Sequence, residues 1–102
     1  MTTASLHDVV ETLRTNVETN KFVDVGKGAA ALLNTSQDRL RVALAVLKEE
    51  GFAVHMVIAK HQDPKVDLKT TVKVLAPVGT SYRDVVQNKQ KISPIQKEDS
   101  NA

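Results

Sequence analysis

Residues 26–52 read GKGAAALLNTSQDRLRVALAVLKEEGF and contain the strongest local pattern in the chain. The pattern predicts two short helices, over residues 26–33 and 36–50, and Gly51 ends the second before a strand. Apolar residues recur at helical spacing on both segments. They are Ala29, Ala30, Leu32 and Leu33 on the first, and Leu40, Ala43, Leu44 and Leu47 on the second.

The two helices are joined by Asn34-Thr35-Ser36. Such a corner needs one residue with positive φ, and Asn is the best substitute for Gly because it tolerates the left-handed region. Ser36 or Thr35 is expected to cap the second helix, and Asp38 stands three residues after Thr35, where it can complete a capping box. The sequence therefore predicts a helix-turn-helix, a scaffold that presents one exposed helix face to the DNA major groove.

Local signals also predict structure on both sides of this unit. The pair Ser5 and Asp8 forms a capping box that opens a helix reaching about Thr19. Phe22 and Val23 are expected to pack or to form a brief strand. Alternating apolar residues predict strands over 52–61 and 68–76, joined by a turn at 62–65, and Ser81 with Asp84 opens a short helix to about Gln90.

The run LLNTSQDRLRVALAVLKEEGFAV, residues 32–54, resembles the winged helix-turn-helix superfamily. In that superfamily a capped recognition helix ends in a Leu-x-x-Glu-Gly segment, here Leu47 to Gly51, and enters a β-hairpin. The resemblance covers roughly residues 5–76. With residues 25–28 and 71–77 included, the chain also resembles small helix-turn-helix proteins of phages and prophages.

The resemblance implies an α+β fold of three helices, a two-stranded β-hairpin wing and a short C-terminal helix. One winged helix-turn-helix domain is expected over residues 1–92, because 102 residues support one domain. The polar residues 93–102, SPIQKEDSNA, are expected to be a disordered tail.

The resemblance also indicates which residues of the recognition helix face base edges: Ser36, Gln37, Asp38, Arg41 and Val42. Gln37 has the groups to bond adenine N6 and N7, and Arg41 those to bond guanine O6 and N7. Arg39 and Lys48 are better placed for phosphates. The alternative is that Arg39, Arg41 and Lys48 only form the solvent-exposed face of an amphipathic helix. For Val42 and Val46, packing is favoured over exposure to a thymine methyl or a partner.

Basic residues outside the recognition helix are further candidates. Lys27, between Gly26 and Gly28, stands where a DNA phosphate could meet a helix N-terminus, although a flexible helix entry explains the same residues. The hairpin carries Lys60, His61, Lys65, Lys69 and Lys73. Lys65 and Lys69 are the expected phosphate contacts there, and lysines on an edge strand also discourage aggregation.

Composition excludes several other classes of protein. The three aromatic residues are Phe22, Phe52 and Tyr82, too few for a base-stacking platform. The absence of cysteine excludes disulfides and thiolate metal sites, and the three histidines show no ligand spacing, so no metal is expected. No catalytic constellation appears, so we expect no enzyme, no cofactor and no small-molecule ligand. No apolar run approaches the ~20 residues of a membrane span, and no signal peptide is evident, which predicts a cytoplasmic protein.

The net charge of +2 is unevenly distributed. Residues 1–25 carry two basic and four acidic groups, residues 26–97 carry twelve basic and six acidic groups, and Glu98 and Asp99 follow. The basic excess thus falls on the segments expected to bind DNA.

Together these features predict a transcriptional regulator that binds double-stranded DNA as a homodimer or higher homo-oligomer. The alternative is a phage structural, assembly or DNA-packaging protein that uses the same fold for protein contacts and is located in the virion. The low overall charge and the acidic first helix favour that alternative.

Overall fold

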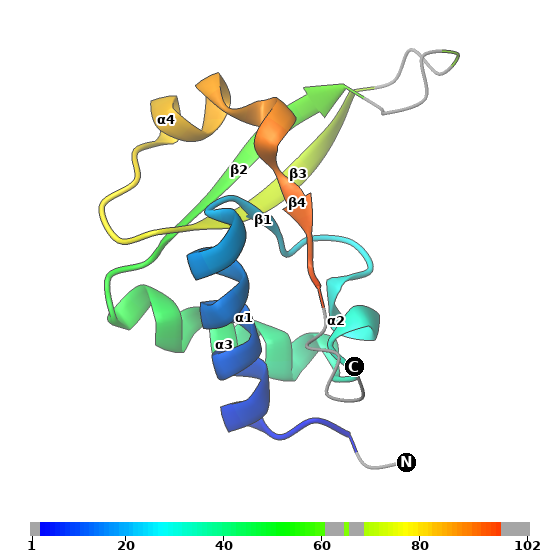
Figure 1. The fold of residues 1–102 in the computed structure, drawn as a ribbon. Coiled ribbons are helices and arrows are strands. Elements are labelled where there is room, and N and C mark those ends of the chain that lie inside the picture. The colour runs from blue at the N-terminus through cyan, green and yellow to red at the C-terminus, as the bar shows by residue number, and fades with distance from the viewer. Residues whose placement is uncertain (1–2, 61–64, 66–68, 97–102) are drawn as a thin grey trace.

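The computed structural model describes residues 3–60, 65 and 69–96, with the backbone alone at residues 59, 60 and 69. It shows an α+β fold in which helices pack on a four-stranded mixed sheet (Figure 1). The elements are α1 (Leu6–Asn20), β1 (Val23–Asp24), α2 (Ala29–Leu32), α3 (Gln37–Glu49), β2 (Ala53–Lys60), β3 (Lys69–Ala76), α4 (Tyr82–Gln87), the 3-10 turn η1 (Lys89–Lys91) and β4 (Ser93–Pro94).

The two long helices, α1 and α3, begin and end close to where the sequence predicts. The Ser5 hydroxyl accepts a hydrogen bond from the backbone N–H of Asp8 and so caps α1. Helix α1 ends one residue beyond Thr19, where Lys21 takes a positive φ of 67°. Helix α3 buries its whole apolar stripe, and α1 buries Val9, Val10, Leu13 and Val17, which explains why periodicity locates both helices well.

Helix α2 is shorter than the predicted span of residues 26–33. It begins only at Ala29, because Gly28 has a φ of 86° and a residue in the left-handed region cannot lie inside an α-helix. Residues 26–28 therefore form a loop that leads from β1 into the helix.

The predicted hairpin is present as β2 and β3, which pair antiparallel from Ala53↔Ala76 to Lys60↔Lys69. The expected strand ends at His61 and Leu68 lie outside the described residues. The hairpin is not an isolated two-stranded wing, because β1 pairs with β3 and β4 pairs with β1, giving the order β2-β3-β1-β4. The brief strand anticipated at Phe22 and Val23 is thus part of the sheet, as Val23–Asp24.

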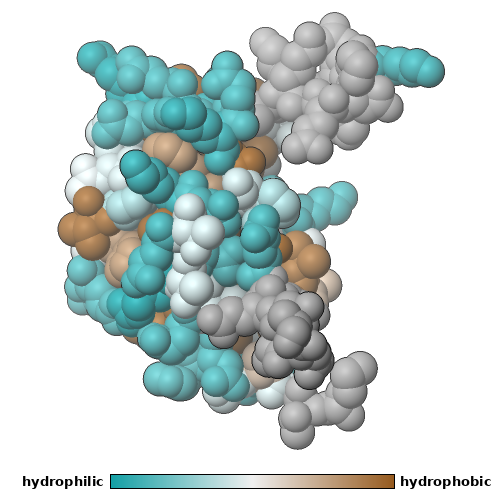
Figure 2. Space-filling model, in the orientation of Figure 1, coloured by the Kyte–Doolittle hydropathy of each residue, from teal (hydrophilic) through white to brown (hydrophobic). Residues whose placement is uncertain are grey.

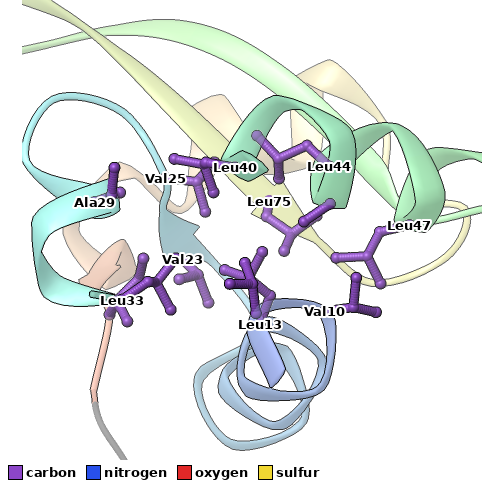
Figure 3. Close-up of a cluster of buried hydrophobic side chains, with 14 of the residues drawn as sticks. Val10, Leu13, Val23, Val25, Ala29, Leu33, Leu40, Leu44, Leu47 and Leu75 are labelled. Atoms are coloured by element: carbon purple, nitrogen blue, oxygen red, sulfur yellow. The ribbon is translucent and has the colours of Figure 1, made fainter. Parts of the chain in front are cut away.

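The sheet separates two apolar clusters. Helices α1, α2 and α3 cover one face, and their side chains meet Val23 and Leu75 of the sheet (Figure 3). Helix α4 covers the other face, where Val85 packs with Phe22, Val57 and Val74. Figure 1 shows the same three layers, with α4 and the α1–α3 group on opposite sides of the strands.

The segment after η1 belongs to the folded domain, which corrects the expected start of the disordered tail at residue 93. Ser93–Pro94 pairs parallel to β1, and Ile95 is 5 % exposed in the cluster beneath the helices. The buried Asn16 side chain donates from Nδ2 to the Gln96 carbonyl oxygen at 2.9 Å and accepts from the Gln96 N–H at 2.7 Å. These contacts join α1 to a segment 80 residues away. Residues 97–102 of the expected tail lie outside the described residues.

Helix α4 opens as predicted and closes earlier. The Ser81 hydroxyl accepts from the Asp84 N–H, and the Asp84 carboxylate accepts from the Ser81 N–H, so the capping box is confirmed. The helix ends at Gln87 rather than near Gln90, and the chain continues in the 3-10 turn η1.

An ion pair ties α1 to the C-terminal end of α3. The Arg14 guanidinium donates from Nη1 and Nη2 to the two carboxylate oxygens of Glu50, and its centre lies 5.8 Å from the centroid of the Phe52 ring. These hydrogen bonds lower the pKa of the Glu50 carboxyl and raise the pKa of Arg14. The pair therefore links α1 to the C-cap residue of α3, just before β2.

Candidate nucleic-acid interface

The corner between α2 and α3 has the backbone that the sequence predicts. Asn34 has a φ of 54°, which confirms it as the left-handed residue of the turn. The N–H of Thr35 donates to the Ala30 carbonyl oxygen at 3.0 Å, and the N–H of Asn34 donates to the Ala31 carbonyl oxygen at 3.1 Å. The corner is therefore held by backbone hydrogen bonds to α2, and it fixes the direction in which α3 leaves.

Ser36 is the residue that caps α3. Its φ and ψ of −86° and 160° are extended, and its hydroxyl accepts from the Arg39 N–H at 3.1 Å. The alternative cap at Thr35 is wrong, and so is the box between Thr35 and Asp38, because the residue three after the cap is Arg39. The Thr35 hydroxyl is buried and has no hydrogen-bond partner within the part of the chain that the structure describes.

One side of α3 is open along its length. The buried residues Leu40, Ala43, Leu44 and Leu47 face the core, while the exposed residues recur at spacings of three and four on the opposite side. Three of the predicted contact residues, Gln37, Arg41 and Lys48, are among those exposed. The packing favoured for Val46 is found, whereas Val42 is 49 % exposed and stands on the open side.

Among the described residues, Arg41 makes one weak local interaction, with Asp38. Its Nη1 lies 3.4 Å from Asp38 Oδ1, and the two side chains are 75 % and 92 % exposed. An ion pair this exposed contributes little to stability, so the guanidinium can turn towards another acceptor.

Arg39, which the sequence places as a phosphate contact, is engaged in a hydrogen bond within the fold. Its Nη1 donates to the Ala4 carbonyl oxygen at 2.6 Å, and the bond is partly buried. The N–H of Ala4 in turn donates to the Asn34 carbonyl oxygen at 2.9 Å. Arg39 thus attaches the segment before α1 to the corner, and a phosphate could bind it only in competition with this contact.

The exposed side of α3 has balanced charge. Arg41 and Lys48 are opposed by Asp38 and Glu49, all four exposed. The side of the molecule on which α1 lies is largely hydrophilic, with its apolar residues in separate groups (Figure 2). Long-range attraction to DNA would therefore depend on lysines outside α3.

The loop over residues 26–28 brings Lys27 near another lysine-bearing element. A Cβ atom placed on Gly26 would lie 3.4 Å from the backbone nitrogen of Lys73. The Val25 N–H donates to the Lys73 carbonyl oxygen at 2.8 Å. Lys27 is exposed and Lys73 is half-buried. The sequence places Lys73 on the hairpin, but its closeness to this loop depends on β1 joining the sheet.

The remaining predicted contacts lie on the hairpin. Lys65 is exposed, and Lys69 is the first residue of β3. His61 lies outside the described residues. The structure therefore distributes the eight candidates over three places: Ser36, Gln37, Arg39, Arg41 and Lys48 on or at the start of α3, Lys27 in the β1–α2 loop, and Lys65 and Lys69 on the hairpin.

Within the described residues, no three His, Asp or Glu side chains are grouped so as to hold a metal ion, and no helix is long and apolar enough to cross a membrane. Comparison with protein-family models, with curated proteins and with solved structures gave no match. The case for a function therefore depends on the geometry above.

Proposed function

We propose that the protein is a winged helix-turn-helix protein that binds double-stranded DNA, as a non-catalytic regulator of transcription. The observation that carries the proposal is the open side of α3, which begins at a tight corner set by Asn34 and ends beside a hairpin. A helix supported on one side only, with polar residues at its N-terminal end, has the form that enters a major groove.

The order of elements supports the winged assignment. Helix α1, strand β1, the pair α2–α3 and the hairpin follow one another, and β1 pairs with the hairpin strand β3. This pairing anchors the hairpin to the helices, so that the hairpin can rest on the DNA backbone while α3 lies in the groove. The additional strand β4 and helix α4 lie beyond this set.

In this proposal some side chains contact base edges and others contact phosphates. Gln37 and Arg41 read base edges near the start of α3. Lys27, Lys48, Lys65 and Lys69 contact phosphates, which adds affinity without sequence preference. Ser36 caps the helix, and Arg39 positions its start through Ala4. Because one domain offers few phosphate contacts, binding uses at least two copies of the chain.

A second candidate function has its own supporting observation. The open side of α3 is charge-balanced and includes the exposed Val42, and the hairpin exposes Met56 and Ile58. These features suit a phage structural or assembly protein that binds another protein rather than DNA. Such a protein would show no salt-dependent affinity for a duplex.

Arg41→Ala tests the DNA proposal, with Arg83→Ala as the matched control. Arg83 is also an exposed arginine, but it lies on α4, across the sheet from α3. Duplex binding is followed by fluorescence anisotropy over a salt series, with a duplex selected from a random pool and its scrambled form. Arg41→Ala should lose about 10- to 100-fold in affinity for the selected duplex, and Arg83→Ala should bind as the parent does.

Two results would contradict the proposal. A parent protein that binds no duplex at low salt would favour the assembly function. Equal losses for both variants would mean that only overall charge matters and that α3 is not the reading element. Lys65→Ala and Lys69→Ala should weaken binding to both duplexes alike, and each should reduce the salt slope by about one unit.

A further inference from the structure

Strand β2 forms an unprotected edge of the sheet. It is the first strand in the order β2-β3-β1-β4, eight residues long, and pairs only with β3 among the described strands. Edge strands usually carry Pro, Lys or a bulge that prevents another strand from adding. The first seven residues of β2, 53–59, read AVHMVIA and contain no proline, lysine or carboxylate, and its one lysine, Lys60, is the last residue of the strand. The opposite edge, β4, is only two residues long and includes Pro94.

The hydrogen bond from Val25 N–H to the Lys73 carbonyl oxygen fixes which way the backbone of β2 faces. Because Lys73 directs its polar backbone groups towards β1, its neighbours Val72 and Val74 direct theirs towards β2. Their partners in the register, Val57 and His55, face β3 in return. The N–H and C=O groups of Val54, Met56 and Ile58 therefore point outwards, away from the sheet.

Two of the three side chains at these positions are also exposed, while Val54 is partly buried and packs against the cluster beneath the helices. Met56 and Ile58 are 61 % and 56 % exposed, whereas Val57 between them is buried against α4. His55 faces the same side as Val57, and its Nε2 donates to the Thr80 carbonyl oxygen at 3.0 Å. The outer edge of β2 thus presents backbone groups that have no partner among the described residues, beside two exposed apolar side chains.

We propose that this edge binds a second copy of the same chain, with the two β2 strands antiparallel about a twofold axis at Met56. In this register Met56 lies opposite Met56 of the second copy, and Val54 lies opposite its Ile58. The two sheets become one sheet of eight strands. The proposal deepens the proposed function, on which its biological role depends, by assigning the interface of the homodimer.

Charge and symmetry favour a second copy over an unrelated partner. An uncharged strand can face itself without opposing like charges, and the first lysine, Lys60, would lie opposite Phe52 of the second copy. A twofold axis of an antiparallel pair stands perpendicular to the sheet, so both copies keep their helices α1–α3 on the same side. The two α3 helices are then related as two DNA half-sites are.

The register can be tested by cross-linking without DNA, so that failure of this inference is distinct from failure of DNA binding. The chain has no cysteine, so Met56→Cys introduces a single thiol. Directly opposite residues in a hydrogen-bonded antiparallel pair have Cα atoms about 5.5 Å apart, within the range of a disulfide. Mild oxidation should convert this variant to a covalent dimer. Val78→Cys, at a position of similar exposure (63 %), should stay largely monomeric on a denaturing gel.

Sedimentation equilibrium of the parent, of Met56→Lys and of Thr71→Lys supplies a second measurement. Met56→Lys places two like charges opposite each other and should raise the dimer dissociation constant at least about tenfold. Thr71→Lys adds the same charge to the same sheet face, one strand away from the edge, and should leave the constant unchanged. A parent that stays monomeric at every concentration, equal cross-linking of the two cysteine variants, or equal dimerisation of the two lysine variants would overturn the proposal.

Discussion

Ile95→Ala tests whether the segment after η1 is part of the core. Ile95 is 5 % exposed and packs in the cluster formed by α1, α2 and α3. Replacing a buried isoleucine by alanine costs about 2–5 kcal/mol, because apolar contact is lost and a cavity remains. The segment is short and lies at the sheet edge, where it can partly collapse into that cavity, so we expect the lower half of this range, about 2–3 kcal/mol. For a domain of this size, that corresponds to a fall in melting temperature of roughly 10–20 °C.

Thermal and urea unfolding followed by circular dichroism measure this change, with Ile58→Ala as the matched control. Ile58 undergoes the same truncation at a site that is 56 % exposed, so its variant should differ from the parent by no more than about 0.5 kcal/mol. Both are measured in protein dilute enough that the melting temperature no longer depends on concentration. If the two variants have the same melting temperature, residues 93–96 do not contribute to the core, and the disordered tail begins at residue 93, as the sequence predicts.

Three further predictions concern the corner, the end of α3 and its ion pair. At Asn34, with its φ of 54°, Gly should be neutral and Val should destabilise by about 1–2 kcal/mol, and an unchanged melting temperature for Val would contradict the assigned backbone. Gly51→Ala should also lower the melting temperature, since Gly51 has a φ of 105° and a Cβ there would lie 3.2 Å from Val78 Cγ1; a variant as stable as the parent would contradict this. Arg14 lowers the pKa of Glu50 below its ordinary value of 4.5, so the ion pair stabilises the folded protein at neutral pH and this contribution is lost as the pH falls through the lowered pKa. The difference in unfolding free energy between the parent and Glu50→Gln, taken from urea unfolding, should therefore be largest at neutral pH and should disappear in acid. A difference that does not change with pH would show that the pair does not act in this way.

The elements that periodicity and capping determine could be predicted from the sequence. Helices α1 and α3 have long apolar stripes, and the turn at Asn34 and the box at Ser81 follow from local side-chain chemistry. Errors arose where two local signals competed. Thr35 and Ser36 are both residues that favour the N-cap position. Ser36 is the cap because its backbone is extended and its hydroxyl reaches the Arg39 N–H.

What the sequence missed depends on contacts between distant residues. The segment SPIQ has one large apolar residue and no periodicity, and its place in the sheet depends on β1 and on Asn16. Among the candidate site residues, the sequence assigns Arg41 to a base edge and Arg39 to a phosphate, yet Arg39 bonds to the Ala4 carbonyl group 35 residues earlier. No spacing rule within α3 predicts this contact, because the acceptor belongs to another part of the chain.

The strand order has a consequence for how the chain folds. Strand β1 lies between β3 and β4, so Val23 is paired on both sides only after Leu75 and Ser93 have reached the sheet. Long-range pairings of this kind raise contact order and slow folding, since the loop must close before any contact compensates for the lost entropy. Helix α1 can form early from its own residues, but the hydrogen bonds between Asn16 and Gln96 form only after Gln96 has been synthesised. During synthesis, the α1–α3 group therefore remains incomplete on one side until residue 96 has left the ribosome.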